Sequence, residues 1–495
     1  MTALSAILPG PLPLLLALPL LGAALLAVLP GWRLAAWLNV GFSAATFAAA
    51  LWLALAPPPP GLFLFIDDFS AALILLTGLV GFSTALFSAA YINRDGKNHR
   101  LAPRHLRLYH AMYQAFMFTL LLALSANNIG ILWVAVEGAT LTTVLMVSLY
   151  RTKPAIEAAW KYFILCSVGI GLALFGTILV YLAAQTVMGD GSPAMAFSLM
   201  TPHAAAFQPE LLNLAFVFLL VGYGTKAGLV PLHAWLPDAH AEGPTPISAV
   251  LSGLLLNVAF YVLLRYKRLL AGNPHTLEPG PLLVGLGVLS VLVAAFMLYR
   301  RGDIKRLFAY SSIEHMGLLA VAFGTGGALA NFAGLLHMLM HSLVKSAIFF
   351  VVGLASQAAG SQRIADIRGL TTSAPLLGWS LVVGVLSIAG LPPLGVFTSE
   401  FLLLNALMHR TPWLGLTLLT LLLLAFAALV LRLQGLAFGP PSPLPGRDGT
   451  KPPRLFTRVI GISPIFLHMA LAVAAGIILP AATASWLWAI AKQLG

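Results

Sequence analysis

The chain has 495 residues, of which 60% are hydrophobic and only 8% are charged. A soluble domain usually carries about a quarter charged residues, so this composition excludes a soluble enzyme, a nucleic-acid-binding domain and a disordered regulator. The net charge of +12 comes from basic residues in short segments between apolar runs, without a basic stripe of interleaved aromatic residues. We therefore expect a polytopic membrane protein that contacts the lipid bilayer and no nucleic acid.

Stretches of about 20 apolar residues, the length that crosses a bilayer, predict about 14 transmembrane helices in an all-α fold. They lie near residues 10–29, 34–56, 70–92, 109–126, 128–149, 160–186, 209–236, 246–266, 281–299, 306–324, 329–357, 372–407 (interrupted), 413–437 and 462–489. The proline-rich and glycine-rich segments 57–61 and 439–453 are expected to be loops. We predict one transmembrane domain over residues 1–495.

Basic residues are unevenly divided between the two sides of this predicted bundle. Lys226 and Lys345 lie inside spans, and five basic residues lie on one side: Arg265, Lys267, Arg268, Arg410 and Lys492. The other 20 of the 27 lysines and arginines lie on the opposite side. Because an excess of basic residues marks cytoplasmic loops, we expect both termini to lie outside the cytoplasm.

A short sequence occurs twice. Residues 228–232 (GLVPL) recur as residues 390–394 (GLPPL), and Pro231 and Pro393 each interrupt an apolar run. Paired, proline-broken spans in the two halves of a transporter indicate inverted repeats and lie beside the substrate path.

Two ionisable residues lie deep inside predicted spans. A charged side chain in mid-membrane costs about 2.5–3.5 kcal/mol on insertion scales, so it needs a partner or a hydrated cavity. Glu137 lies in the middle of the span 128–149, too far from either end for its carboxylate to reach the interface easily. Lys226 lies just before the break at Pro231. We predict that both residues carry protons.

His337, His341 and Lys345 follow one another at spacings of four, so they share one face of a helix. Histidine exchanges protons readily near neutral pH. Two histidines at this spacing also bind metals in some proteins, but no third ligand or glutamate base follows nearby in this helix. We therefore expect a proton path and no metal, with packing as the alternative role.

Further acidic groups and histidines accompany the two halves. Glu400 follows the break at Pro393, where it marks either the N-terminal region of a helix or the far end of a proton path. Glu314 and His315 lie inside the span 306–324 and are candidates for the same path.

Four ionisable residues share a proline-broken segment, where they either gate entry from the cytoplasm or cap helices: His233, Asp238, His240 and Glu242. Asp67 and Asp68 are expected to be solvated in a loop. The single cysteine, Cys166, lies in an apolar run, so we expect no disulfide and no thiolate metal cluster.

The sequence contains no nucleophile elbow, phosphate-binding loop or dinucleotide fingerprint. We therefore expect proton or cation translocation and no cofactor in this chain.

Residues 226–240 (KAGLVPLHAWLPDAH), 303–312 (DIKRLFAYSS) and 337–345 resemble signature segments of the antiporter-like subunits of respiratory complex I. The resemblance covers nearly the whole chain and implies a 14-helix fold with two inverted five-helix repeats, each containing a broken helix. It divides the chain into N-terminal helices, a first repeat, a second repeat and a C-terminal helix, at residues 1–108, 109–270, 281–437 and 462–489.

The same resemblance implies a hydrated central axis with Glu137 paired to Lys226, Lys345 in the middle and Glu400 at the far end. One position departs from the pattern. Many complex I subunits carry a lysine on the eighth helix, where this chain has Asn257. Because an asparagine orders water but carries no proton as a cation, bound water would have to bridge this point.

Residues 311–316 and 160–169 are more similar to the hydrogenase-4 component F branch of this superfamily. The resemblance therefore implies a non-catalytic, proton-translocating subunit of a redox complex in a bacterial or archaeal inner membrane. Its partners would be other membrane subunits and a peripheral hydrogenase-like arm with iron–sulfur and nickel–iron centres. The alternatives are a cation/proton antiporter subunit, a complex I subunit, the membrane half of an inorganic-carbon uptake complex, or an inactive scaffold.

Overall fold

The computed structural model describes residues 10–29, 31–97, 101–442 and 455–495, and the regular structure of these residues is helical. Within them, 13 helices are long and apolar enough to cross a membrane, and a shorter apolar helix covers Pro375–Ile388. This confirms the predicted all-α polytopic fold. Four basic residues used for the predicted orientation lie outside the described residues: Arg100, Arg447, Lys451 and Arg454.

The chain divides into two compact units. Unit 1 contains the described residues up to Ala227 together with Leu254–Pro279, and unit 2 contains Gly228–Gly253 and the described residues from Gly280 onward. The helices of unit 1 are α1 (Pro11–Val28), α2 (Trp32–Leu55), α3 (Asp68–Lys97), α4 (Pro103–Ser125), α5 (Ile129–Val147), α6 (Lys153–Met188), α7 (Phe197–His203), α8 (Pro209–Ala227) and α11 (Leu256–Ala271).

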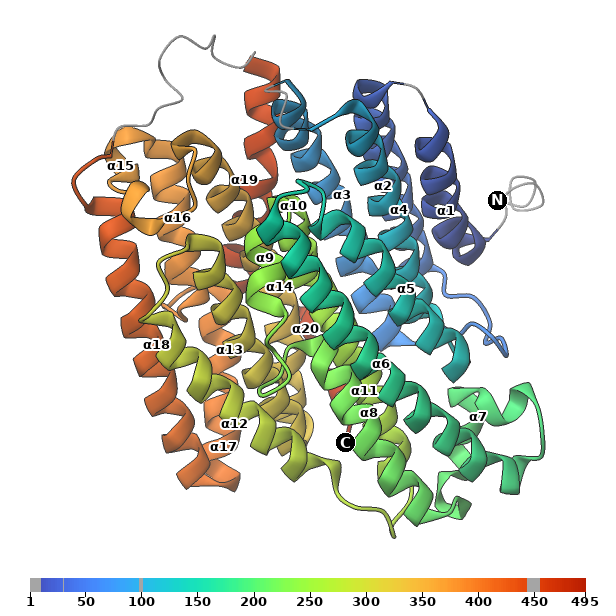
Figure 1. The fold of residues 1–495 in the computed structure, drawn as a ribbon. Coiled ribbons are helices and arrows are strands. Elements are labelled where there is room, and N and C mark those ends of the chain that lie inside the picture. Colours follow the sequence, from blue (N-terminus) through green and yellow to red (C-terminus); the bar gives the residue numbers. More distant parts are fainter. Residues whose placement is uncertain (1–9, 30, 98–100, 443–454) are drawn as a thin grey trace. The chain divides into compact units, whose positions relative to one another are not determined.

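In unit 1, α4 packs against α1 and α5, and α6 packs against α5 and α8 (Figure 1). Small residues allow the close approach of α6 and α8. A Cβ atom at Gly222 would lie 2.5 Å from the Gly169 carbonyl oxygen, and one at Gly176 would lie 2.8 Å from the Ala215 carbonyl oxygen. Since lipid provides little hydrophobic drive for helix association, such close packing stabilises the pair by van der Waals contact.

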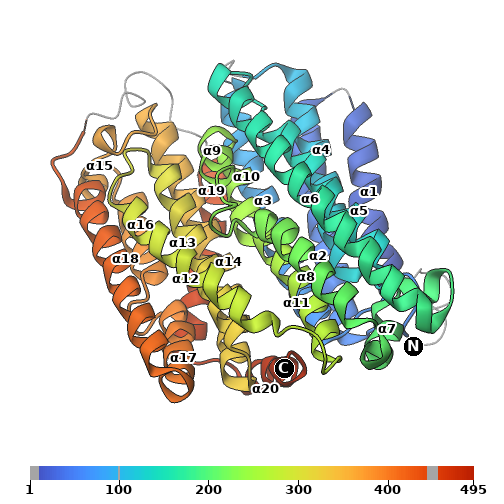
Figure 2. The same cartoon turned by 60° about the horizontal axis from the view of Figure 1, so that its bottom comes forward.

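The helices of unit 2 are α9 (Leu236–Glu242), α10 (Thr245–Val250), α12 (Pro279–Leu298, from its second residue), α13 (Ile304–Thr325), α14 (Ala328–Ala359), α15 (Leu370–Ser373), α16 (Pro375–Ile388), α17 (Gly395–Arg410), α18 (Pro412–Phe438), α19 (Leu455–Ile477) and α20 (Ala481–Gln493). Helix α14 packs against α10, α13, α16, α17, α19 and α20 (Figure 2). It is therefore the central helix of unit 2, and the polar residues along it lie in the interior.

Both copies of the repeated pentapeptide interrupt a helix. Helix α8 ends at Ala227 and α16 ends at Ile388. The glycines that begin the two copies, Gly228 and Gly390, have φ angles of +75° and +70°. This left-handed region is open to glycine at little cost, so each helix ends where its sequence supplies one. The Val230–Pro231 and Pro392–Pro393 peptide bonds are both cis.

The predicted C-terminal helix at 462–489 is divided into α19 and α20. Pro480 is the residue before α20. Because proline has no backbone N–H to continue the preceding helix but fits at a helix start, the division falls here. The predicted span at 372–407 is likewise two helices, α16 and α17, as its interruption indicates.

Candidate functional site

Lys226 is the centre of a polar cluster inside unit 1. Its side chain is completely buried one residue before the end of α8. The Nζ atom donates hydrogen bonds to Thr140 Oγ1 at 2.7 Å and to Tyr162 Oη at 2.9 Å. It also lies 5.0 Å from the centre of the Tyr162 ring, within the range of a cation–π contact. The direct hydrogen-bond partners of the ammonium are therefore neutral hydroxyls.

Glu137 is joined to this cluster through Thr140. Thr140 Oγ1 donates to Glu137 Oε2 at 3.1 Å, and Ser167 Oγ donates to Glu137 Oε1 at 3.0 Å. Glu137 and Lys226 also interact electrostatically. The structure thus brings together the two residues that the resemblance pairs, with one hydroxyl between them.

The other members of the cluster were not identified from the sequence. Thr140 follows Glu137 by three residues on α5, a spacing that places both on one helix face. Tyr162 and Ser167 come from α6, and Thr143 Oγ1 lies 2.6 Å from Tyr162 Oη. The spacing of Thr140 was a usable signal, whereas the α6 residues required knowledge of how α5, α6 and α8 pack.

Unit 2 contains a buried histidine pair. His315 on α13 and His337 on α14 form a hydrogen bond of 2.9 Å between His315 Nδ1 and His337 Nε2. His337 Nδ1 lies 2.9 Å from Ser399 Oγ on α17. The centre of the His341 ring lies 5.4 Å from that of His315. The spacing on α14 placed two of these histidines together, and the tertiary structure adds His315 and Ser399.

Lys345 continues the same face of α14. Its buried Nζ donates to the Phe308 carbonyl oxygen at 2.9 Å and lies 5.7 Å from the Phe308 ring centre. Lys345 and Glu314 interact electrostatically. Both ring nitrogens of His341, one turn earlier, are buried without a protein hydrogen-bond partner in the described structure. Buried polar atoms of this kind are normally satisfied by ordered water, so we expect water along this face.

Glu400 joins the histidine pair. It is the sixth residue of α17, beyond the first turn, and its carboxylate packs against Gly390. Favourable interaction with the helix dipole is confined to the first turn, so the position does not support the capping alternative for this residue. One ligand-type atom from each of His315, His337 and Glu400 lies within 4.8 Å of the other two.

The proline-broken segment forms ion pairs that cap and anchor α9. Arg306 lies 3.1 Å from Asp238 and 3.6 Å from Glu242. Lys305 Nζ donates to the carbonyl oxygens of Ala241 and Gly243 at 3.0 and 2.6 Å. These carbonyls lie at the C-terminal end of α9, where a cation is favoured. The capping alternative therefore describes this end of the segment.

The two histidines of the segment have aromatic neighbours in unit 2. The His233 ring lies 6.2 Å from the Tyr310 ring, and the buried His240 ring stacks 5.1 Å from Phe349. In unit 1, Asn257 is buried in α11.

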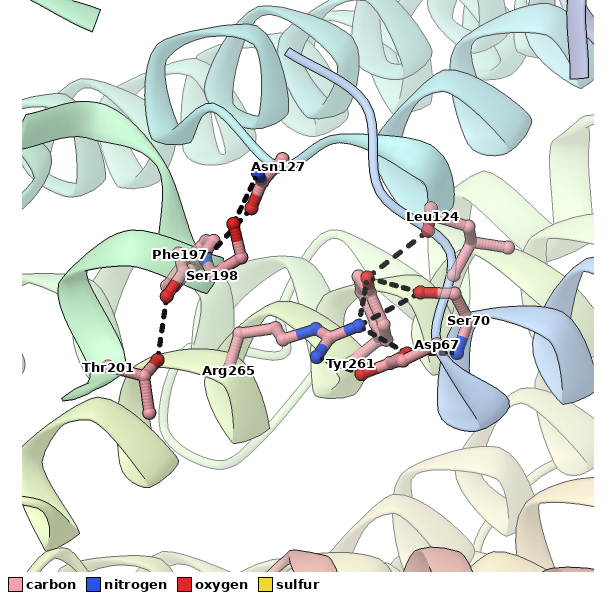
Figure 3. A network of polar contacts seen from close by, with 9 residues as sticks. All are labelled: Asp67, Ser70, Leu124, Asn127, Phe197, Ser198, Thr201, Tyr261 and Arg265. Atoms are coloured by element: carbon pink, nitrogen blue, oxygen red, sulfur yellow. Dashed lines mark hydrogen bonds and ion pairs between the residues drawn. The ribbon is translucent and has the colours of Figure 1, made fainter. Parts of the chain in front are cut away.

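The expectation that Asp67 is a solvated loop residue is wrong. Arg265 of α11 donates two hydrogen bonds to its carboxylate, at 2.5 and 2.7 Å (Figure 3). The same guanidinium donates to Ser70 Oγ and Tyr261 Oη, each at 2.9 Å. Burial alone would raise the pKa of Asp67, but the charge and hydrogen bonds of Arg265 prevail and lower it to about 2. The loop is thus fixed to α11 by a bidentate ion pair, which hydropathy cannot reveal.

Comparison with known proteins supports the same classification. The model of the family "NADH:quinone oxidoreductase/Mrp antiporter, TM" matches residues 126–425. The Hydrogenase-4 component F homolog of Methylacidiphilum infernorum is 54% identical over 468 residues, which make up 94% of this chain and 96% of that protein.

Solved structures share the fold. A chain of the membrane-bound sulfane sulfur reductase, an archaeal respiratory membrane complex, matches with a TM-score of 0.84 and 23% identity over 98% of this chain and 97% of that chain. A chain of respiratory complex I from Thermus thermophilus matches with a TM-score of 0.75 and 26% identity over 96% of this chain and 99% of that chain. The resemblance found in the sequence is confirmed, and the chain belongs to the NADH:quinone oxidoreductase/Mrp antiporter family of membrane proteins.

Proposed function

We propose that this chain translocates protons as a membrane subunit of a multi-subunit redox complex. The observation that carries the proposal is the hydrogen-bonded series Lys226–Thr140–Glu137, in which a buried ammonium is joined to a carboxylate through one hydroxyl. The cost of burying ionisable groups in a membrane makes such a series a functional candidate by default.

The hydroxyl bridge suits a switch better than a permanent ion pair would. A hydroxyl both donates and accepts, so Thr140 transmits a change in the charge of one partner to the other. Two ionisable groups coupled in this way titrate as a pair. Water entry or a charge moving near Glu137 would therefore change how firmly Lys226 holds its proton.

In unit 2 the relay would be made of imidazoles. The direct hydrogen bond between His315 and His337 provides a step across which a proton can move. Histidine has an ordinary pKa that suits exchange near neutral pH. Lys345 and Glu400 would serve as the buried base and the final acid of this half, in the positions that the resemblance implies.

The partner would supply the energy, because the proposed role of this chain is proton transfer alone. The similarity to a Hydrogenase-4 component F homolog favours a hydrogenase-4-like complex with a peripheral iron–sulfur and nickel–iron arm. We place the complex in a bacterial or archaeal inner membrane, with both termini of the chain outside the cytoplasm.

The test begins with purification of the chain from its native membrane in mild detergent and identification of its companions by mass spectrometry. Recovery of a nickel–iron hydrogenase-like large subunit with iron–sulfur proteins supports the proposal. Recovery of small membrane subunits alone, with sodium-dependent exchange in the absence of an electron donor, would instead indicate a cation/proton antiporter.

The role of Lys226 is tested in the same complex. Lys226→Ala should abolish electron-donor-driven proton movement into closed vesicles while the complex still assembles. Lys161→Ala is the matched control, because Lys161 is exposed and pairs with Glu157 on the surface of α6. Normal proton movement in a fully assembled Lys226→Ala complex would contradict the proposal.

A further inference from the structure

From the arrangement of His315, His337 and Glu400 we infer a binding site for a divalent transition metal of the Zn²⁺ class. The three residues come from three helices, α13, α14 and α17, and all three are buried. Metal binding is independent of the proposed function, and its effect on proton movement rests on that function. A bound ion would replace the proton shared by the two imidazoles and close the relay.

The spacing of the donor atoms is close to what a tetrahedral metal requires. With Zn–N distances of 2.0–2.1 Å, two ligand nitrogens lie about 3.4 Å apart. His315 Nδ1 and His337 Nε2 are 2.9 Å apart, so the rings need to separate by only about 0.5 Å. The carboxylate of Glu400 lies within 4.8 Å of both rings and would complete three protein ligands. Three ligands leave a fourth position for water.

The hydrogen bonds around His337 orient its lone pair toward this position. Ser399 Oγ donates to the Val396 carbonyl oxygen at 2.8 Å, so it accepts from His337 Nδ1. The remaining nitrogen, His337 Nε2, is then the unprotonated one and faces His315. A histidine ligand whose other nitrogen is held by a hydrogen bond is the usual arrangement in metal sites.

Binding requires one proton shift inside the cluster. His315 Nδ1 currently provides the proton of the histidine–histidine hydrogen bond. When the metal takes both lone pairs, this proton moves to Nε2 of the same ring, and the Ile388 backbone interacts with that imidazole. No proton is gained or lost by the two neutral histidines, whereas Glu400 must bind as a carboxylate.

The surrounding charges are mixed. Glu314 on α13 adds a second carboxylate near Glu400, whereas Lys345 on α14 opposes a cation. His341 and His240 also face Lys345. Imidazole nitrogen donors favour zinc, cobalt, nickel and copper over sodium, magnesium or calcium, and the ligand set therefore selects a transition metal.

Metal titration of the purified, chelator-treated complex tests the site. We expect Co²⁺ to give the intense visible spectrum of a tetrahedral ion and Zn²⁺ to abolish that spectrum by displacement. His337→Gln and Glu400→Gln should each weaken Co²⁺ binding at least about tenfold. Glu400→Gln keeps the side-chain volume against Gly390, and Glu400→His, which supplies a nitrogen donor, should retain the tetrahedral spectrum.

His110→Gln is the matched control, because His110 is a fully buried histidine of α4 in unit 1. It should bind Co²⁺ as the unaltered chain does. The spectrum of hydrated, octahedral Co²⁺ in the unaltered complex, or equal binding by the His337→Gln and Glu400→Gln variants, would overturn the site. Normal proton movement by Lys226→Ala overturns the proposed function instead, so the two failures are distinguishable.

Discussion

The buried ammonium of Lys226 donates a 2.7 Å hydrogen bond to the hydroxyl of Thr140, and that hydroxyl in turn donates to the carboxylate of Glu137. The two charges are thus coupled through a group that changes its hydrogen bonding without changing its charge. Such a link is easier to make and break than a buried ion pair, whose separation leaves an uncompensated charge at a cost of about 3–5 kcal/mol.

Thr140→Val should remove the link while keeping the shape of the side chain. A hydrogen bond to a charged group contributes about 1.5–3 kcal/mol, so we expect proton movement to fall about 10- to 100-fold. Thr140→Ser keeps the hydroxyl and should restore most of the rate. Initial rates of proton uptake into closed vesicles, normalised to the amount of assembled complex, measure the effect. Equal rates for the valine and serine variants would show that the hydroxyl is not the link.

Tyr162→Phe should separate the two interactions that this side chain makes with Lys226. The substitution removes the 2.9 Å hydrogen bond and keeps the ring that lies 5.0 Å from the ammonium. We expect proton movement to fall several-fold, because one neutral partner of the buried ammonium is lost. Tyr113→Phe is the control, since Tyr113 is an equally buried tyrosine that donates to the Gly81 carbonyl oxygen instead. A larger loss for the control would refute a specific role for Tyr162.

Asp67→Asn should destabilise unit 1 by breaking its bidentate pair with Arg265. The pKa of Asp67 is lowered to about 2, against about 3.9 in an unfolded chain. The ion pair therefore stabilises the fold by about 2–3 kcal/mol above pH 4, and this contribution disappears as the pH falls toward 2. Thermal unfolding in detergent between pH 3 and 7 measures it. The acid-induced loss should be smaller in Asp67→Asn, and an unchanged pH profile would contradict the assignment.

Much of the fold follows from the sequence because its signals are local. A run of about 20 apolar residues has few stable alternatives in a bilayer. Proline and glycine determine where a helix stops, so the breaks near Pro231 and Pro393 could be located from residue type alone. The division before Pro480 was missed because the surrounding residues are apolar enough to resemble one uninterrupted span.

The site was only partly predictable. Charge burial pointed to Glu137 and Lys226, and a spacing of four pointed to His337 and His341. Contacts between helices are not encoded in such local patterns, so Tyr162, Ser167 and Ser399 went unnoticed. Asp67 was misjudged for the same reason, since its partner Arg265 is 198 positions away.

Gly390→Ala should disturb the Glu400 carboxylate directly. A Cβ atom at Gly390 would collide with Glu400 Oε2, and the φ angle of +70° adds backbone strain of about 1–2 kcal/mol. Gly360→Ala isolates the strain, because Gly360 has a φ angle of +68° and nothing lies within 4 Å of its added Cβ. Both variants should lose similar backbone stability in thermal unfolding. Only Gly390→Ala should also lose proton movement and Co²⁺ binding, and equal losses in the two variants would show that displacement of Glu400 is not the cause.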